Sequence, residues 1–220
     1  GAGLILMPLF VLREKSAVHP LFDITLISRN RTFAFSSLAA LIHYAATSAI
    51  GFFLSLFLQY IKDLGPRDAG FVLMSWPITM ALFSPLAGKL SDRHNPGVLA
   101  SIGMAISAAG LVMLCFLDEQ TSVTFIVSVL IIMGAGFSLF SSPNSNAIMS
   151  SVEKRQLGNA SGMLGTMRNV GQTLSMAIAL MLLALYMGQE KIKPDNYPEL
   201  MESMKSGFIV FSILCFAGIF

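Results

Sequence analysis

The sequence contains few charged residues. Of its 220 residues, only 12% are Asp, Glu, Lys or Arg, whereas 55% are hydrophobic. A soluble domain carries about 25% charged residues and needs polar surface to cover its core. We therefore expect lipid to surround most of the chain. The formal net charge of +2 is also too small to indicate a nucleic-acid partner.

Reactive and metal-binding groups are scarce as well. The two cysteines, Cys115 and Cys215, lie inside apolar runs, so no disulfide framework is expected. The three histidines, His19, His43 and His94, fall on separate segments, which argues against a metal site. The apolar runs contain no HExxH motif, no CxxC motif and no acidic pair. The sequence thus predicts a protein that is not an enzyme and needs no cofactor, with an intramembrane enzyme as a remote alternative.

Long uncharged runs make up most of the chain. Residues 32–61, 69–88, 95–117 and 120–152 contain no Asp, Glu, Lys or Arg, and residues 156–189 contain only Arg168. A helix needs roughly 20 apolar residues to cross the hydrocarbon layer. Such segments must be helical to satisfy their backbone in lipid, since the strands of a membrane barrel are only about 10 residues long. We predict an all-α, polytopic membrane helix bundle with the lipid bilayer as its main partner.

The charged positions set the expected boundaries. The predicted spans cover about 33–61, 69–90, 97–117, 121–148, 157–187 and a truncated 206–220. Residues 1–12 are interpreted as the end of a preceding membrane helix, and 13–32 as a cytoplasmic connection. Pro143 predicts a kink or a helix end in the fourth span. Both ends of the chain resemble cut helices, so we expect a fragment of a longer protein.

Basic residues orient these spans. Eight fall in alternate connections on one side, and five fall on the other. By the positive-inside rule, the more basic side is cytoplasmic. The eight are Arg13, Lys15, Arg29, Arg31, Lys89, Arg93, Lys154 and Arg155, and the five are Lys62, Arg67, Lys191, Lys193 and Lys205.

One cytoplasmic turn carries a motif. Residues 85–98 read PLAGKLSDRHNPGV, in which Gly88, Leu90, Asp92 and Arg93 form G-x-L-x-D-R. This resembles the signature loop of the major facilitator superfamily, which joins the second and third helices of each six-helix half. There the Gly permits close helix approach, the Asp faces a helix N-terminus, and the Arg holds the Asp. The resemblance implies a conformational latch, and a simple topology anchor is the alternative.

Longer stretches extend the resemblance over nearly the whole chain. PLFDITLISRNRTF, FLQYIKDLGPRDAGFVLMSWP and GNASGMLGTMRNVGQTLSMAIA are similar to the second half of the fourteen-helix drug:proton antiporters. The resemblance implies that residues 33–220 form a C-terminal six-helix repeat, and that 1–12 end the extra helix pair between the halves. It further implies alternating access in a prokaryotic cell (inner) membrane, with the missing N-terminal half as partner.

The function implied by this resemblance is proton-driven export of small amphipathic, drug-like compounds. The proton gradient would supply the energy. The alternatives are an exporter of a metabolite, peptide or siderophore, a facilitator without proton coupling, and a structural membrane domain. No span carries an acidic residue, so we expect a coupling carboxylate in the missing half, or His43 in its place.

The first span carries a polar stripe. Tyr44, Ser48, Ser55 and Gln59 share one helix face, and such a face should meet protein or water rather than lipid. The resemblance places this helix at the central cavity, while a packing stripe is the alternative. His43 flanks the stripe, and an imidazole is a group that can titrate near neutral pH. A proton or substrate role and a structural role both stay open for it.

Other candidates come from three further spans. Trp76 could stack on an aromatic or cationic substrate, and Arg168 could face the cavity or reach back to the interface. The packing of Gly158 and Gly162 against a neighbouring helix is expected from their GxxxG spacing, with Gly165 on the same face. The remaining candidates for the cavity are Phe137, Asn144 and Gln172.

Overall fold

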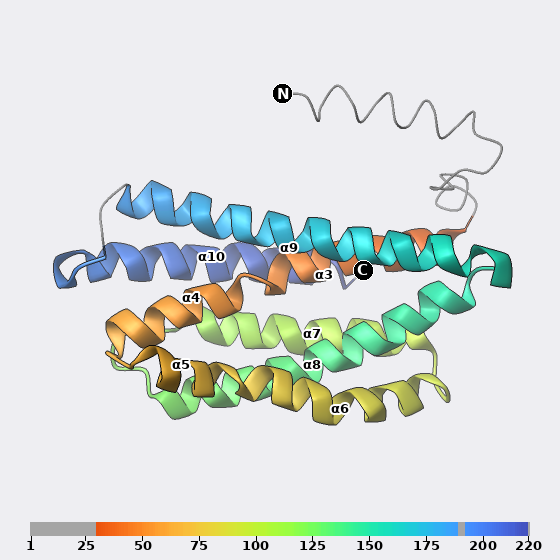
Figure 1. The fold of residues 1–220 in the computed structure, drawn as a ribbon, viewed down its shortest axis with the longest axis horizontal. Coiled ribbons are helices and arrows are strands. Elements are labelled where there is room, and N and C mark those ends of the chain that lie inside the picture. Colours follow the sequence, from red (N-terminus) through yellow and green to blue (C-terminus); the bar gives the residue numbers. More distant parts are fainter. Residues whose placement is uncertain (1–29, 189–191, 220) are drawn as a thin grey trace, which may run out of the picture.

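The computed structural model describes residues 30–188 and 192–219, which form a bundle of long helices (Figure 1). Throughout this described part every regular element is helical. Six helical stretches are long and apolar enough to cross a membrane. The predicted all-α membrane helix bundle is therefore confirmed. The expectations for 1–12, and for nearly all of 13–32, lie outside the described residues.

The spans differ in how continuous they are. The first comprises α3 (Arg31–Thr47), α4 (Ile50–Leu56) and a π-helix, η1 (Phe57–Ile61). The second comprises α5 (Pro66–Leu73) and α6 (Ser75–Ser91). The others are α7 (Pro96–Cys115), α8 (Val123–Ser150), α9 (Leu157–Met187) after a 3-10 turn η2 (Lys154–Gln156), and α10 (Tyr197–Ala217) after a 3-10 turn η3 (Pro194–Asn196).

Polar side chains begin several of these helices. The side chain of Asn30 accepts a hydrogen bond from the N–H of Phe33 at the start of α3. Asn95 and Ser122 cap α7 and α8 in the same way. An N-cap of this kind satisfies one of the backbone donors that have no partner within the helix. These caps therefore help to fix where α3, α7 and α8 start.

The helices differ from the predicted spans in two details. The last helix begins at Tyr197, not near 206, because its charged first turns include Glu199 close to the N-terminal end, where the helix dipole favours an acidic side chain. Of the two outcomes predicted at Pro143, a kink or a helix end, the helix end is wrong, because Pro143 lies inside α8. A proline removes one backbone hydrogen bond, and the packing of α8 against α3, α6 and α7 holds the helix through that position.

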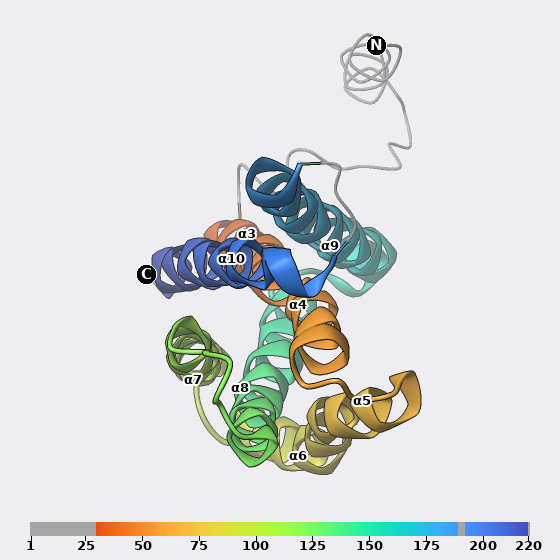
Figure 2. The same ribbon diagram turned by 90° about the vertical axis from the view of Figure 1, so that its left-hand side faces the viewer.

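The helices pack in two groups that α8 and α3 connect. α8 packs against α6 and α7, and α3 packs against α9 and α10. The end-on view shows α7 and α10 along one side of the bundle, and α5, α6 and α9 along the other (Figure 2). α3 also contacts α8, and α10 contacts α7. These contacts join the groups into one bundle.

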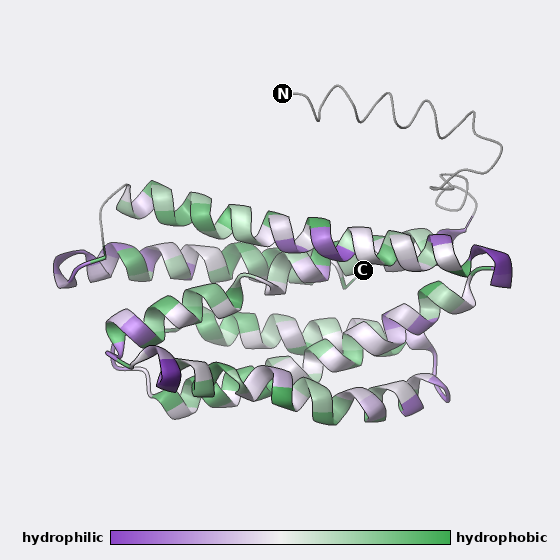
Figure 3. Cartoon of the chain, viewed as in Figure 1, coloured by the Kyte–Doolittle hydropathy of each residue, from purple (hydrophilic) through white to green (hydrophobic). Residues whose placement is uncertain are grey.

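The connections alternate between the two ends of the bundle (Figure 1). At one end, Lys62 donates a hydrogen bond to the backbone oxygen of Glu119, which ties two turns together. At the other end, Asn146 donates to the Ser91 hydroxyl over 3.1 Å. Hydrophilic residues gather at these ends, and one hydrophilic band interrupts α9 partway along its length (Figure 3). This is the antiparallel arrangement that the alternation of basic residues predicts.

α7 and α8 meet at glycines. A Cβ added to Gly103 would clash with the backbone of Leu139 and Phe140, and one added to Gly136 would lie 2.9 Å from the backbone oxygen of Gly103. Small residues allow this close approach of two helix backbones, which is a main source of helix association in lipid. Around the contact lies one apolar core that includes Phe53, Phe208 and Phe211.

We predict that Gly103→Ala lowers the free energy of unfolding by about 2 kcal/mol or more, because the added methyl group meets backbone that cannot move aside. Thermal unfolding of the full-length natural protein in detergent micelles, followed by circular dichroism, measures the change. The matched control is Gly70→Ala on α5, where an added Cβ meets no atom within 4 Å. Equal melting temperatures for the two variants would contradict the close contact.

Candidate functional site

A hollow of about 310 Å³ opens on the bundle between α3, α4, α5, α6, α8 and α9. Ligand sites in proteins are concave and mostly apolar with a few polar groups, and start at about this size. We call it the aromatic hollow. The structure brings five of the predicted cavity residues together there, namely Tyr44, Ser48, Trp76, Phe137 and Gln172.

Three rings from three helices form one wall of the aromatic hollow. Phe137 of α8 lies between Tyr44 of α3, with ring centroids 5.5 Å apart, and Trp76 of α6, with centroids 6.0 Å apart. The interplanar angles of 77° and 67° are those of edge-to-face pairs, which favour aromatic contacts beyond simple burial. The wall presents ring faces and edges to whatever enters.

The break between α3 and α4 also lies at the aromatic hollow. The Thr47 hydroxyl donates to the backbone oxygen of His43, and the Ser48 hydroxyl donates to that of Tyr44. The N–H of Ala49 donates to the buried Ser175 hydroxyl of α9 over 2.9 Å. A side chain of a neighbouring helix thus replaces the backbone acceptor that an unbroken helix would supply. Thr47 and Ser48 are left with only oxygen lone pairs to offer a ligand.

α9 supplies the polar edge. Its Gly171 fits closely against α3, since an added Cβ would lie 2.6 Å from the backbone oxygen of Leu41. The next residue, Gln172, lines the aromatic hollow. The guanidinium carbon of Arg168 lies 5.1 Å from the centroid of the Tyr44 ring, a cation–π geometry. Arg168 therefore stands beside the aromatic wall.

The three glycines predicted to pack helices do not do so in the described part of the chain. A Cβ added to Gly158, Gly162 or Gly165 would meet no atom within 4 Å. The close contact of α9 is instead made by Gly171, which has no glycine partner at GxxxG spacing. The GxxxG spacing does not indicate Gly171. Close approach of two helices needs a small residue at the point of contact, and the spacing alone does not say where that point lies.

His43 lies behind the aromatic wall. It is fully buried, stacks on Phe140 at a centroid distance of 4.0 Å and an angle of 13°, and its Nε2 lies 3.3 Å from the Ser107 hydroxyl. That hydroxyl donates its hydrogen to the backbone oxygen of Gly103. Ser107 must then accept from His43, which assigns the hydrogen to Nε2 and leaves Nδ1 as a bare acceptor.

A proton on Nδ1 would be buried without a partner. Among the residues that the structure describes, no hydrogen-bond partner reaches Nδ1 of His43. A second N–H there would need an acceptor that those residues do not provide, and a buried unpaired charge is costly. The geometry favours the structural role for His43 over the proton-carrying role.

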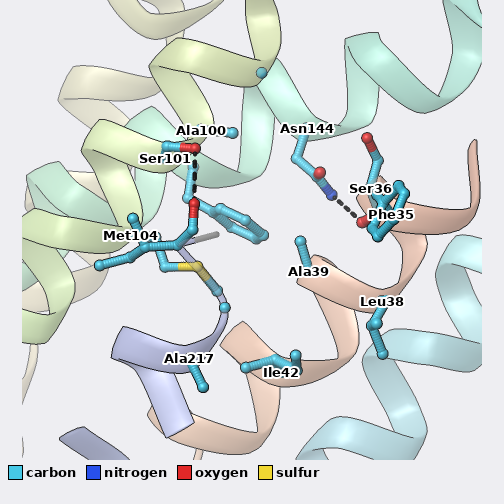
Figure 4. Close-up of a pocket in the computed structure, with 14 residues that line it drawn as sticks. Phe35, Ser36, Leu38, Ala39, Ile42, Ala100, Ser101, Met104, Asn144 and Ala217 are labelled. Carbon is cyan, nitrogen blue, oxygen red and sulfur yellow. Dashed lines mark hydrogen bonds between the residues drawn. The ribbon is translucent and has the colours of Figure 1, made fainter. Parts of the chain in front are cut away.

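Three other predicted residues lie outside the aromatic hollow. Gln59 donates to the Ser55 hydroxyl over 2.8 Å, so these two side chains partner each other one turn apart. Asn144 donates to the backbone oxygen of Ser36 over 3.1 Å. It thereby ties α8 to α3 at a second, largely apolar hollow between α3, α7, α8 and the end of α10 (Figure 4).

The predicted latch is not closed within the described residues. Asp92 and Arg93 are exposed, and the only ion pair in the ranges that the structure covers joins Arg155 to Glu153. Asn95, not Asp92, caps the following helix. A Cβ on Gly88 would lie 3.5 Å from the Ser142 hydroxyl, an ordinary contact. The turn thus presents a free carboxylate and a free guanidinium, and the bond between Asn146 and Ser91 holds this end of α6 to α8.

The family model of the Major Facilitator Superfamily matches residues 36–220. The chain belongs to this superfamily. Its members are membrane transporters, so the chain is an integral membrane protein of a transporter family, and no catalytic family is indicated.

Curated relatives from this superfamily include several bacterial transporters. The chain is 34% identical to the Escherichia coli K12 transporter YebQ over 79% of its length and 38% of that protein. It is 29% identical to the riboflavin transporter RibZ of Clostridioides difficile, over 99% of the chain and 47% of RibZ. It is 27% identical to the multidrug resistance protein Stp of Mycobacterium tuberculosis, over 81% of the chain and 33% of Stp. The chain thus spans about a third to a half of the length of these relatives.

We predict that His43→Ala destabilises the protein by about 2 kcal/mol or more through the cavity it leaves, while the pH profile of transport keeps its shape. Thermal unfolding and transport at a series of pH values, both on the full-length natural protein, provide the two measurements. His94→Ala, in an exposed turn, is the control for losing a histidine. A shifted pH profile in a normally stable His43→Ala variant would restore the proton-carrying role.

Proposed function

We propose that the full-length protein exports small amphipathic, drug-like compounds in exchange for protons. In this mechanism the chain forms the C-terminal six-helix repeat, and the aromatic hollow forms one wall of the translocation path. The observation that carries the proposal is the aromatic hollow itself, an open, largely apolar depression with a few polar groups on its edge. Rocking of two repeats would expose it to each side of the membrane in turn.

The exposure of the spans supports a partner on the side of the aromatic hollow. The spans differ in how much of their apolar 18-residue stretch is buried inside the bundle. The buried share is 11% for the α5–α6 span and 22% for the α9 span, against 44–61% for the other four spans. Both spans border the aromatic hollow. Residues such as Leu82 on α6 and Leu174 on α9 are exposed. An N-terminal repeat placed against these two spans would close the path.

Several relatives support a drug-like cargo. They include Stp, described as a multidrug resistance protein, the tetracenomycin C resistance and export protein of Streptomyces glaucescens, and the colistin resistance protein EmrB of Acinetobacter baumannii. Their names report export or resistance for those proteins. Shared sequence over most of this chain makes export of an amphipathic compound the function that we favour.

Proton coupling needs a group that changes charge during the cycle. The described parts of α3, α4, α6, α7, α8 and α9 contain no Asp or Glu, and the contacts of His43 favour a structural role for it. We therefore assign the coupling carboxylate to the N-terminal repeat. The bacterial relatives favour a prokaryotic cell membrane as the location.

Collapse of the proton gradient tests this function. We expect the full-length protein in inverted membrane vesicles to accumulate an amphipathic dye when a proton gradient is present, and to stop when an ionophore collapses it. Vesicles without the protein provide the background. Transport that continues unchanged after collapse would contradict proton coupling, and a facilitator would only bring the dye to equal concentrations on the two sides.

A second candidate is transport of a metabolite. The similarity to RibZ extends over almost the entire chain, and the aromatic hollow suits a planar compound. Uptake or export of labelled riboflavin by the full-length protein would favour this candidate, whereas transport of unrelated dyes would favour drug export.

We predict that Asp92→Asn slows transport by about fivefold or more, while the variant protein inserts and folds normally. Fivefold is about the smallest effect that a conformational coupling free energy usually produces. In the proposed cycle, the Asp92 carboxylate contacts the N-terminal repeat in one conformation and is released from it in the other. The matched control is Asp63→Asn in the opposite turn, where Asn suits the positive φ of 51°. Unchanged transport by Asp92→Asn would make the turn only an anchor.

A further inference from the structure

We propose that the aromatic hollow selects planar aromatic compounds carrying an anionic group, and disfavours lipophilic cations. This rests on the proposed function, since it names the class of substrate for the same path. The argument combines the shape of the aromatic wall with the sign of the charge beside it.

The wall favours flat aromatic compounds. Tyr44, Phe137 and Trp76 form a continuous edge-to-face series across α3, α8 and α6. Leu73, Met80 and Leu130 complete the lining with apolar surface. A planar ring system inserted between these groups gains both apolar burial and directed ring contacts.

The charge beside the wall is positive. Arg168 lies over the Tyr44 ring, one helical turn before Gln172, which lines the aromatic hollow. Arg168 is exposed and makes no ion pair within the described chain. Its guanidinium therefore keeps its donors for an incoming acceptor, and its planar fork suits a carboxylate or sulfonate.

No negative charge in the described lining helices balances Arg168. Of the helices that contribute residues to the aromatic hollow, only α5 carries a carboxylate, Asp68, in its first turn. Arg67 precedes Asp68 directly, so that turn is neutral overall. A cation in the aromatic hollow would meet like charge from Arg168 without a carboxylate from these described helices to offset it, which is unfavourable.

The side-chain hydrogen-bond donors that remain for a ligand lie on one edge of the aromatic hollow. The hydroxyl hydrogens of Thr47 and Ser48 are already donated to backbone oxygens of α3. The side chain of Gln172, a residue inside α9, makes no hydrogen bond to other described residues, so its amide N–H groups are free to donate. With Arg168, the donors thus gather on the α9 edge, where they would receive the acceptor end of an anionic substrate.

Two xanthene dyes of opposite charge test the proposal. Fluorescein is anionic and rhodamine 123 is cationic, while their fused ring systems are alike. We expect the purified full-length protein to bind fluorescein about tenfold more tightly than rhodamine 123, and Arg168→Gln to remove about tenfold of the fluorescein affinity, the size of one charge-assisted contact. Arg168→Lys should retain part of it. The control Arg155→Gln, at the α8–α9 connection, should leave both affinities unchanged.

The outcomes distinguish a failure of the proposed substrate class from a failure of the proposed export function. Tighter binding of rhodamine 123, equal binding of both dyes, binding of neither, or an Arg168→Gln variant with unchanged fluorescein affinity would overturn the substrate class. Gradient-driven transport of rhodamine 123 in vesicles would at the same time uphold proton-coupled export. If fluorescein binds as expected but no dye moves under a proton gradient, the substrate class stands and the export function fails.

Discussion

Polar groups in this bundle have almost no water to bond to, and the rest of the structure follows from that constraint. Every backbone amide in the hydrocarbon needs a partner, so the chain is helical throughout the spans. Hydroxyl groups on the helices donate to carbonyl oxygens one turn back, as Thr79, Ser84 and Thr173 do. Polar side chains that bond to a neighbouring helix hold the two helices together. Polar side chains without such a partner are expected to face a water-filled cavity rather than lipid.

The aromatic hollow arises where a close helix contact and a backbone hydrogen bond to a neighbouring helix occur together. Gly171 brings α9 close to α3, which puts the Ser175 hydroxyl within reach of the Ala49 N–H. That bond stabilises the break between α3 and α4, where Thr47 and Ser48 line the aromatic hollow. On the opposite side, the glycine contact between α7 and α8 sets the position of Phe137 and Phe140 relative to His43. Helix packing thus determines which side chains face the path.

The sequence predicted the spans well because their signal is long and simple. A run of about 20 uncharged residues has one stable solution in lipid. The start of α10 was harder to predict because Glu199, Glu202 and Lys205 interrupt the apolar pattern, although charges in the first turns of a span can lie at the interface. Pro143 was a poor guide, since packing on several sides carries α8 through it.

The sequence was less informative about which polar residues face the path. Helical periodicity put Tyr44 and Ser48 on one face with Ser55 and Gln59. The later pair lies beyond the helix break, does not line the aromatic hollow, and bonds within itself. The apolar lining residues Leu73, Met80 and Leu130 carried no signal, because they look like any other residues of a span. His43 and Asn144 could be assigned only when Ser107 and the backbone of Ser36 were seen beside them.

The central claim is that the aromatic hollow faces a water-filled substrate path rather than lipid. Single cysteines at Ser48 and Gln172, in a full-length background without other reactive cysteines, test it with a membrane-impermeant thiol reagent. Ile209, an exposed apolar residue on α10, provides the lipid-facing comparison. The account predicts that both hollow positions react, that bound substrate protects them, and that a cysteine at 209 stays unlabelled. Labelling at 48 and 172 no faster than at 209 would contradict it.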